Sequence, residues 1–283
     1  MAETLKYSTY RQSNEQSIPV VLIHGWGLNS AVWQPLIDNL PPTFTEYFHI
    51  ITIDLPGFGL NVNEKVSPYS LDNICQYIAK TIDQPAIYIG WSLGGLVATE
   101  MALTHADKVL ALITVASSPR FVEERAIESS DSNEENTLVW PGIKPHVLEV
   151  FHQQLKVDAK KTINGFLKLQ AMGSPHVRHD IKQISQLVFQ HEMASKAILD
   201  ESLMLLETSD YRQQLSNINQ PFLRLYGSAD SLVPKSVIAH VTKFSEKNSD
   251  EFIFERASHA PFISHLDDFT EVLSSWLLSH FLR

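Results

Sequence analysis

A serine in a glycine-rich pentapeptide is the first residue of this sequence that could do chemistry. Gly90-Trp91-Ser92-Leu93-Gly94 fits the G-x-S-x-G pattern, in which a serine occupies a sharp turn between a strand and a helix. Such a turn exposes the hydroxyl at the helix N-terminus, where the dipole and free amides favour developing negative charge. The pattern predicts a nucleophilic serine. An ordinary glycine-rich turn with a capping serine is the alternative.

A serine hydroxyl is a weak nucleophile unless a base takes its proton and a carboxylate orients that base. His259 follows an apolar run at residues 251–254 after a short loop, and Asp230 closely follows an apolar run at residues 222–226. Either residue alone is more often structural. Because both come after the carboxyl ends of predicted strands, we expect them to lie at one edge of a sheet. We therefore predict a catalytic triad of Ser92, Asp230 and His259.

Acyl transfer also needs hydrogen-bond donors aimed at the oxyanion. His24-Gly25-Trp26-Gly27 follows the first apolar run and is similar to the HGGG-type loop, whose backbone amide works together with that of the residue after the nucleophile. We assign this role to the amides of Trp26 and Leu93. We interpret His24 as structural, because His259 is the better candidate for the base.

Six short apolar runs are predicted to be the strands that position these residues. They are nearly continuous in apolar character, as expected of strands buried on both faces, and they span residues 20–23, 49–53, 86–89, 110–115, 222–226 and 251–254. Helical patterns, as at residues 71–82 and 96–104, alternate with the runs. The sequence therefore predicts an α/β fold with a mostly parallel sheet flanked by helices.

The alternation stops after Val115, and residues 120–210 contain no convincing strand pattern. We interpret them as a helical cap inserted into a core of residues 1–119 and 211–283. Residues 123–136 are rich in Glu, Ser and Asn, so their low hydrophobicity predicts a mobile acidic loop. The rest of the segment keeps apolar residues at helical spacing, among them Val147, Leu148, Phe151, Leu155, Ala159, Ile163, Phe166 and Leu167.

Composition excludes several other classes of protein. The chain has 283 residues, a net charge of −10 and one cysteine. The negative charge disfavours nucleic-acid partners and anionic membranes, and a single cysteine excludes an intramolecular disulfide and cysteine-rich zinc sites. We find no secretion signal near the start and no apolar run of the roughly 18 residues that span a bilayer. We expect a cytoplasmic monomer with no metal and no cofactor.

These motifs resemble the α/β-hydrolase superfamily across nearly the whole chain. Longer segments resemble the family of pimeloyl-[acyl-carrier protein] methyl ester esterases of biotin synthesis, namely residues 25–29, 90–97, 115–119, 140–145, 222–227 and 260–265. The resemblance implies a serine carboxylesterase that hydrolyses the methyl ester of a carrier-bound pimeloyl group and releases methanol. The sequence departs from the family pattern at residues 123–136, which look like an insertion, and at Leu60-Asn61.

The resemblance also implies which residues bind the substrate and its carrier. The segment of Phe166, Leu167, Lys168, Leu169 and Gln170 would line the acyl channel together with Trp26, and the substrate would also bind at Ser92, Leu93 and His259. From Lys144 to Lys182 the chain has seven basic and three acidic residues, so this stretch is positive within an acidic protein. Because acyl carrier proteins are acidic as a family, we predict docking at Lys161, Arg178 and Lys182. A solvated cap helix without a partner is the alternative.

Two other functions stay open at the level of sequence. One is a broad-specificity short-chain carboxylesterase or another serine α/β-hydrolase. The other is a catalytically silent binding protein that keeps the hydrolase fold. The dependence of turnover on acyl length distinguishes the broad-specificity esterase from the predicted function. A silent binding protein would show no turnover on any ester.

Overall fold

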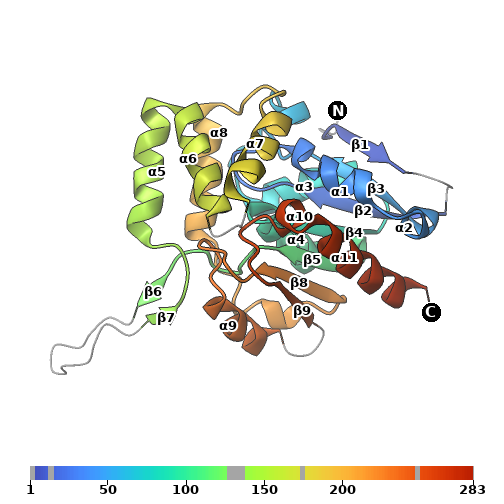
Figure 1. Ribbon diagram of the computed structural model, residues 1–283. Helices are drawn as coiled ribbons and strands as arrows, with labels where there is room; N and C mark the ends of the chain where they lie inside the picture. Colours follow the sequence, from blue (N-terminus) through green and yellow to red (C-terminus); the bar gives the residue numbers. More distant parts are fainter. Residues whose placement is uncertain (1–3, 12–15, 126–137, 173–175, 246–248, 283) are drawn as a thin grey trace.

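A seven-stranded sheet lies at the centre of the computed structural model, which describes residues 4–11, 16–125, 138–172, 176–245 and 249–282 (Figure 1). All neighbouring strands in this sheet are parallel except at one edge, where β1 pairs antiparallel with β3. This arrangement confirms the predicted α/β fold class. The strands, in spatial order, are β1 (Tyr7–Tyr10), β3 (Phe48–Ile53), β2 (Ile18–Ile23), β4 (Ala86–Trp91), β5 (Val109–Val115), β8 (Phe222–Gly227) and β9 (Ser249–Phe254).

Burial differs between the middle and the edges of this sheet. Strands β3, β4 and β8 are buried along their whole length, as their continuous apolar runs predict. The prediction of burial is wrong for most of β9, because this strand forms an edge and leaves Phe252 41% exposed. The other edge, β1, has the sequence Tyr-Ser-Thr-Tyr, and its mixed polarity gave no strand prediction.

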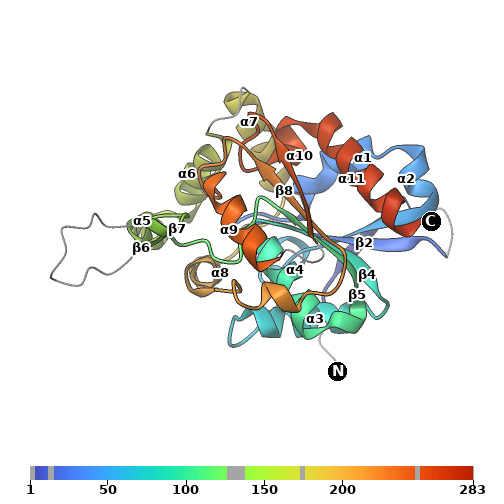
Figure 2. The same cartoon turned by 90° about the horizontal axis from the view of Figure 1, so that it is seen from below.

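Helices cover both faces of the sheet (Figure 2). One face carries α3 (Leu71–Thr81) and α4 (Leu93–Thr104), and the opposite face carries α1 (Gln34–Asn39), α10 (Pro261–Ser264) and α11 (Leu266–Phe281). The remaining helices of this part of the chain are α2 (Pro42–Tyr47), α9 (Ser236–Phe244) and the short 3-10 helices η1 (Ser30–Trp33), η2 (Gly59–Asn61), η3 (Ala106–Lys108) and η4 (Leu215–Asn217).

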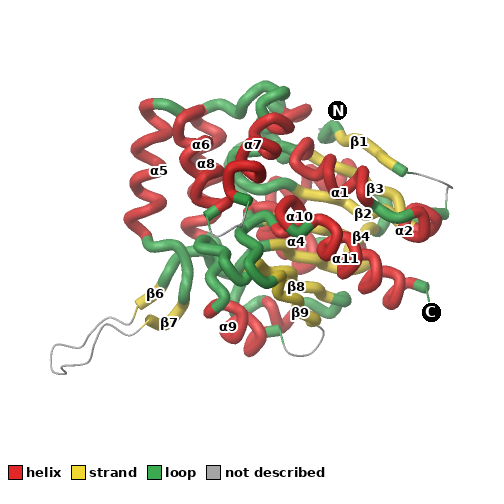
Figure 3. The backbone as a smooth tube through the Cα atoms, viewed as in Figure 1, coloured by secondary structure: helices red, strands yellow, loops and turns green. Residues whose placement is uncertain are grey.

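Four helices between β5 and β8 lie together beside the sheet, and we call them the cap (Figure 3). They are α5 (Pro145–Val157), α6 (Ala159–Ala171), α7 (Val177–Val188) and α8 (Lys196–Thr208). Asp158 separates the first two, because its side chain accepts a hydrogen bond from the amide of Lys161 at 2.9 Å and so begins a new helix.

A short hairpin corrects the prediction that the cap segment contains no strand. It pairs β6 (Glu124–Arg125) antiparallel with β7 (Leu138–Trp140). Residues 126–137 lie outside the described part of the chain, so the predicted acidic loop stays a prediction. The boundaries of the cap at residues 120 and 210 also stay predictions.

The described residues contain neither a membrane-spanning helix nor a cluster of metal ligands. No helix in the described ranges has both the length and the apolar character that crossing a membrane requires. Within the same ranges, no cluster of three or more His, Cys, Asp or Glu side chains is arranged to hold a metal ion.

Candidate active site

Ser92 lies in the turn between β4 and α4, and its backbone is strained. Its φ of 55° and ψ of −117° lie in a region that residues with a side chain rarely adopt. The two glycines of the motif make the turn possible, because a Cβ on Gly90 would collide with the carbonyl of Gly94, and one on Gly94 with the carbonyl of Ile23. The Ser92 side chain makes no capping hydrogen bond with α4, which argues against the alternative of a capping serine.

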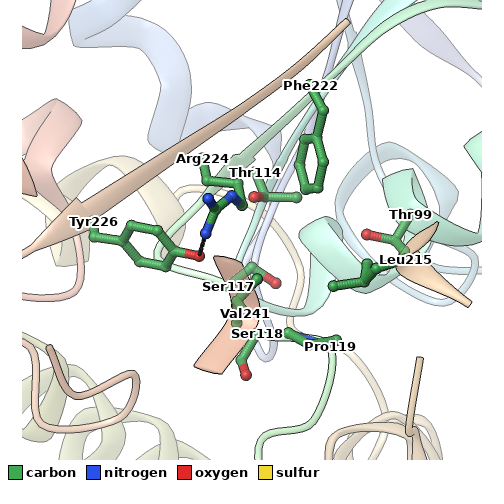
Figure 4. A pocket seen from close by; sticks show the side chains of 10 residues that line it. All are labelled: Thr99, Thr114, Ser117, Ser118, Pro119, Leu215, Phe222, Arg224, Tyr226 and Val241. Atoms are coloured by element: carbon green, nitrogen blue, oxygen red, sulfur yellow. Dashed lines mark hydrogen bonds between the residues drawn. The ribbon is translucent and has the colours of Figure 1, made fainter. Parts of the chain in front are cut away.

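Hydrogen bonds with the end of β5 and the residues after it stabilise this turn. The Ser92 amide donates to Val115 O at 2.9 Å, and the Ser117 hydroxyl donates to Ser92 O at 2.8 Å. Ser117 also lines a cavity of about 10 Å³ beside the buried guanidinium of Arg224 (Figure 4). The cavity has space for about one water molecule. The backbone of Ser92 is therefore fixed by hydrogen bonds from neighbouring elements.

Asp230 and His259 are hydrogen-bonded to each other. The distance from His259 Nδ1 to Asp230 Oδ2 is 2.8 Å, and both side chains are buried. The other carboxylate oxygen, Oδ1, accepts from the amides of Leu232 and Val233 at 2.8 and 3.0 Å. We assign the proton to Nδ1, because it faces a carboxylate. Nε2 is buried and has no hydrogen-bond partner among the described residues, so its lone pair can accept a proton.

The loop after β2 lies against Ser92. A Cβ on Gly25 would be 3.3 Å from Ser92 Cβ, so Trp26 immediately follows a residue in contact with the nucleophile candidate. Leu93 is the first residue of α4, and the first amides of a helix have no partner inside it. Leu93 thus adjoins Ser92 in the chain, and Trp26 adjoins a residue packed against Ser92, while the role of their amides as oxyanion donors stays a prediction.

His24 holds this loop in place as a neutral imidazole. Its Nε2 accepts from the Leu55 amide at 3.0 Å, and its Nδ1 is 2.8 Å from Gly25 O. Burial lowers the pKa of His24 below the ordinary value of 6.5, although the Asp54 carboxylate opposes this effect. A histidine that uses both ring nitrogens in backbone hydrogen bonds fits the predicted structural role.

Comparisons with known proteins identify the family of this chain. Residues 18–266 match the family described as the alpha/beta hydrolase fold. The chain belongs to the α/β-hydrolase family. It is 40% identical to the pimeloyl-[acyl-carrier protein] methyl ester esterase of Aliivibrio fischeri strain ES114, over 96% of this chain and 98% of that protein. The protein of the same name from Vibrio vulnificus strain YJ016 is 41% identical, over 94% and 96% of the two chains.

Solved structures are similar in fold. An esterase from Exiguobacterium antarcticum superposes with a TM-score of 0.76 at 20% identity, over 96% of this chain and 94% of that one. MenH from S. aureus gives a TM-score of 0.71 at 21% identity, over 96% and 98%. Because relatives at 40% identity over nearly the whole chain are esterases and the fold is that of the α/β-hydrolases, this protein is a carboxylic ester hydrolase.

The cap of this esterase covers the candidate site with part of α6. The ring of Phe166 contacts that of Trp26 edge to face, with centroids 4.9 Å apart. Gln170 O accepts a hydrogen bond from the His259 amide at 3.1 Å. The Gln170 side chain is buried, and neither its Oε1 nor its Nε2 has a partner among the described residues. Phe166 and Gln170 thus contact Trp26 and His259, and their role in an acyl channel stays a prediction.

The other α6 residues predicted for the acyl channel differ in burial. Leu167 is fully buried, Leu169 is half-buried, and Lys168 is exposed. Lys168 lines an outer groove of about 520 Å³ between α5 and α6, together with Lys161. The structure therefore gives no support to Lys168 as a channel residue, because Lys168 lies on the exposed face of α6.

The three residues predicted to dock a carrier are exposed on the cap. Lys161 is on α6, while Arg178 and Lys182 are four residues apart on α7. A side chain without a predicted role also contacts the site: Nε1 of Trp91 donates to His259 O at 2.7 Å. The position of Trp91 in the pentapeptide was visible in the sequence, but its partner depends on the conformation of a distant loop.

Proposed function

We propose that this esterase hydrolyses the methyl ester of a pimeloyl group attached to an acyl carrier protein and releases methanol. The relatives at 40–41% identity carry this name and match nearly the whole chain. The observation that carries the chemistry is the buried Asp230–His259 hydrogen bond at 2.8 Å, with Nε2 of the histidine unpartnered. It supports a base for Ser92 in a site covered by the cap.

In the proposed reaction, Ser92 Oγ attacks the ester carbonyl carbon while His259 Nε2 takes the hydroxyl proton. The amides of Trp26 and Leu93 stabilise the oxyanion of the tetrahedral intermediate. His259 then gives the proton to the departing methoxide, which leaves as methanol, and Asp230 stabilises the imidazolium. A water molecule, deprotonated by His259, hydrolyses the acyl-enzyme and restores Ser92. No cofactor or metal takes part in these steps.

The cap supports the choice of an acyl substrate. Phe166 contacts Trp26, which follows the residue packed against Ser92, and two aromatic rings near the nucleophile suit the methylene chain of a pimeloyl group. The buried amide of Gln170 offers a donor and an acceptor, so it can bind a polar group of the substrate. We propose that Lys161, Arg178 and Lys182 attract the acidic carrier at the surface of the cap.

The test is turnover of pimeloyl methyl ester on an acyl carrier protein, compared with free methyl esters of shorter, equal and longer dicarboxylic acids. We expect the highest kcat/KM for the carrier-linked ester. A short free ester with an equal or higher kcat/KM would favour the broad-specificity carboxylesterase. A stoichiometric burst on an activated ester without turnover would favour the silent binding protein.

A further inference from the structure

Trp91 lies where three parts of the proposed catalytic site meet. It precedes Ser92 in the chain, and its side chain is fully buried. A Cβ on Gly25 would be 3.1 Å from Cε3 of the Trp91 ring, so the indole packs against the proposed oxyanion loop. Its Nε1–H donates to the carbonyl of His259 at 2.7 Å. One side chain thus contacts the loop and the proposed base while its backbone adjoins the nucleophile.

The backbone N–H and C=O of His259 form hydrogen bonds with two different parts of the fold. Its N–H donates to Gln170 O at 3.1 Å, and its C=O accepts from Trp91. Gln170 belongs to α6 of the cap, whereas Trp91 is the last residue of β4. His259 itself lies in the loop between β9 and α10. If the cap moves to admit substrate, the bond to Gln170 is lost and the bond to the sheet remains.

We propose that Trp91 is a positioning residue whose indole N–H holds the His259 backbone, so that Nε2 keeps its place relative to Ser92 independently of the cap. This inference rests on the proposed triad. A displacement of about 1 Å between reacting groups can lower turnover by roughly 100-fold. Loss of one anchor from a loop that keeps its bond to Asp230 should cost less, and we expect a fall in kcat of about tenfold.

Trp33 provides a matched control for a role in packing alone. It is also fully buried, and it contacts the same neighbour, Phe262, with ring centroids 4.3 Å apart, against 5.1 Å for Trp91. Its Nε1 has no hydrogen-bond partner among the described residues. Trp33→Phe and Trp91→Phe remove the same atoms from one aromatic cluster, but Trp91→Phe also removes a hydrogen bond to His259.

The experiment compares these two variants on a small activated ester, with thermal midpoints measured in parallel. Trp91→Phe should lose about tenfold in kcat with KM changed less than about twofold, while Trp33→Phe keeps kcat. The downfield NMR signal of the proton between His259 and Asp230 should broaden in Trp91→Phe and persist in Trp33→Phe. Replacement of Trp91 by benzothienylalanine, which keeps the ring shape and lacks the N–H, gives the same test if Trp91→Phe does not fold.

Equal losses in both variants would overturn the proposal, because packing would then explain them. Wild-type kcat in Trp91→Phe would overturn it as well. Ser92→Ala, measured beside them, separates the two levels of inference. If Ser92→Ala is inactive and Trp91→Phe is unaffected, the triad stands and only the positioning role is wrong. If Ser92→Ala keeps its turnover, the triad fails and the positioning role fails with it.

Discussion

Strand β4 and helix α6 both lie against the candidate site, but they are packed differently. Every residue of β4 is buried, and the turn that follows leaves no room for a Cβ at Gly90 or Gly94. Helix α6 buries one face, including Ile163 and Phe166, and exposes Lys161 and Lys168 on the other. The sheet is thus enclosed on all sides near Ser92, whereas the cap has a free outer surface.

This difference separates two tasks. Groups that react must be held within a fraction of an ångström. The close-packed carboxyl end of β4 can hold them in this way, because the residues around it have no room to move. A partner needs an exposed surface whose residues can change without disturbing the site. We therefore expect substitutions at the carboxyl end of the sheet to slow the hydrolysis of every ester. Substitutions on the outer surface of the cap should slow only that of the carrier-linked ester.

The largest effect is expected for Ser92→Ala. Loss of the proposed nucleophile should lower kcat by about 10⁴-fold or more on every ester. The fold should persist, because the removed hydroxyl makes no capping bond with α4. Turnover by purified variant protein with a wild-type thermal midpoint checks this. Activity above about a tenth of wild type would contradict the assignment, since oxyanion donors alone cannot supply that much.

Asp230→Asn should lower kcat by about 10³- to 10⁴-fold. The amides of Leu232 and Val233 hold Oδ1 of the present side chain, so they should keep the oxygen of an asparagine in the same place. The NH₂ group of the asparagine would then donate to His259 Nδ1 and leave the ring proton on Nε2. Nε2 would no longer have the lone pair that accepts the proton of Ser92.

His259→Ala should lose turnover to a similar extent, and its kcat is the reference for Asp230→Asn. Both variants should remain folded, because the amides of Leu232 and Val233 still bind the side chain at position 230. An Asp230→Asn protein with full specific activity and early unfolding would show a structural role for the aspartate.

The same contrast explains how much of the fold could be predicted. Strands β3, β4 and β8 lie within two residues of their predicted bounds, because burial on both faces leaves a continuous apolar run in the sequence. The edge strand β1 has only one neighbour in the sheet, so its residues need not be apolar. The two-residue strand β6 is too short for any periodicity to show.

The candidate site could be predicted only in part, for a related reason. Ser92, Asp230 and His259 follow strand ends, and strand ends can be located from the pattern. The contact of Trp91 with His259 depends on the path of residues 255–260, which contain no regular element. The exposure of Lys168 depends on which face α6 turns toward the site. The sequence resemblance does not resolve this and assigned all of residues 166–170 to the channel.

A smaller effect, confined to one substrate, is expected on the outer cap. Charge reversal at Lys161, Arg178 and Lys182 should lower kcat/KM for the carrier-linked ester by about tenfold at low salt, with a smaller loss at high salt. A small free ester should be hydrolysed at the wild-type rate. Steady-state kinetics on both esters over a range of salt concentrations measure this.

The matched control places the same charge change elsewhere, at the exposed residues Lys6, Lys80 and Lys243. This variant should keep most of the kcat/KM for the carrier-linked ester. If both triple variants lose activity equally, net charge explains the effect and the cap has no special role. Equal effects of the cap variant on both esters, or none on either, would remove these three residues from carrier docking.

The smallest expected effect is a change in the stability of the fold with pH, caused by two buried histidines. Burial lowers the pKa of both His24 and His49 below 6.5, against the opposing effects of Asp54 on His24 and Ser17 on His49. Both rings therefore bind protons less readily in the folded state than in the unfolded chain, which binds them below about pH 6.5. The stabilisation is present above that pH and is lost as the pH falls, by up to about 1.4 kcal/mol per pH unit for each such histidine.

Urea unfolding between pH 7.5 and pH 5.5 measures this loss. His49 lies in β3 with its Nδ1 2.8 Å from Ser17 Oγ, so His49→Gln keeps a polar side chain there and removes one titrating group. The slope of the unfolding free energy against pH should become shallower. His179 on α7 has a side chain that is 77% exposed, and His179→Gln is the control from the cap. If His179→Gln flattens the slope and His49→Gln does not, the pH sensitivity arises in the cap, and the core is not the more constrained region in this respect.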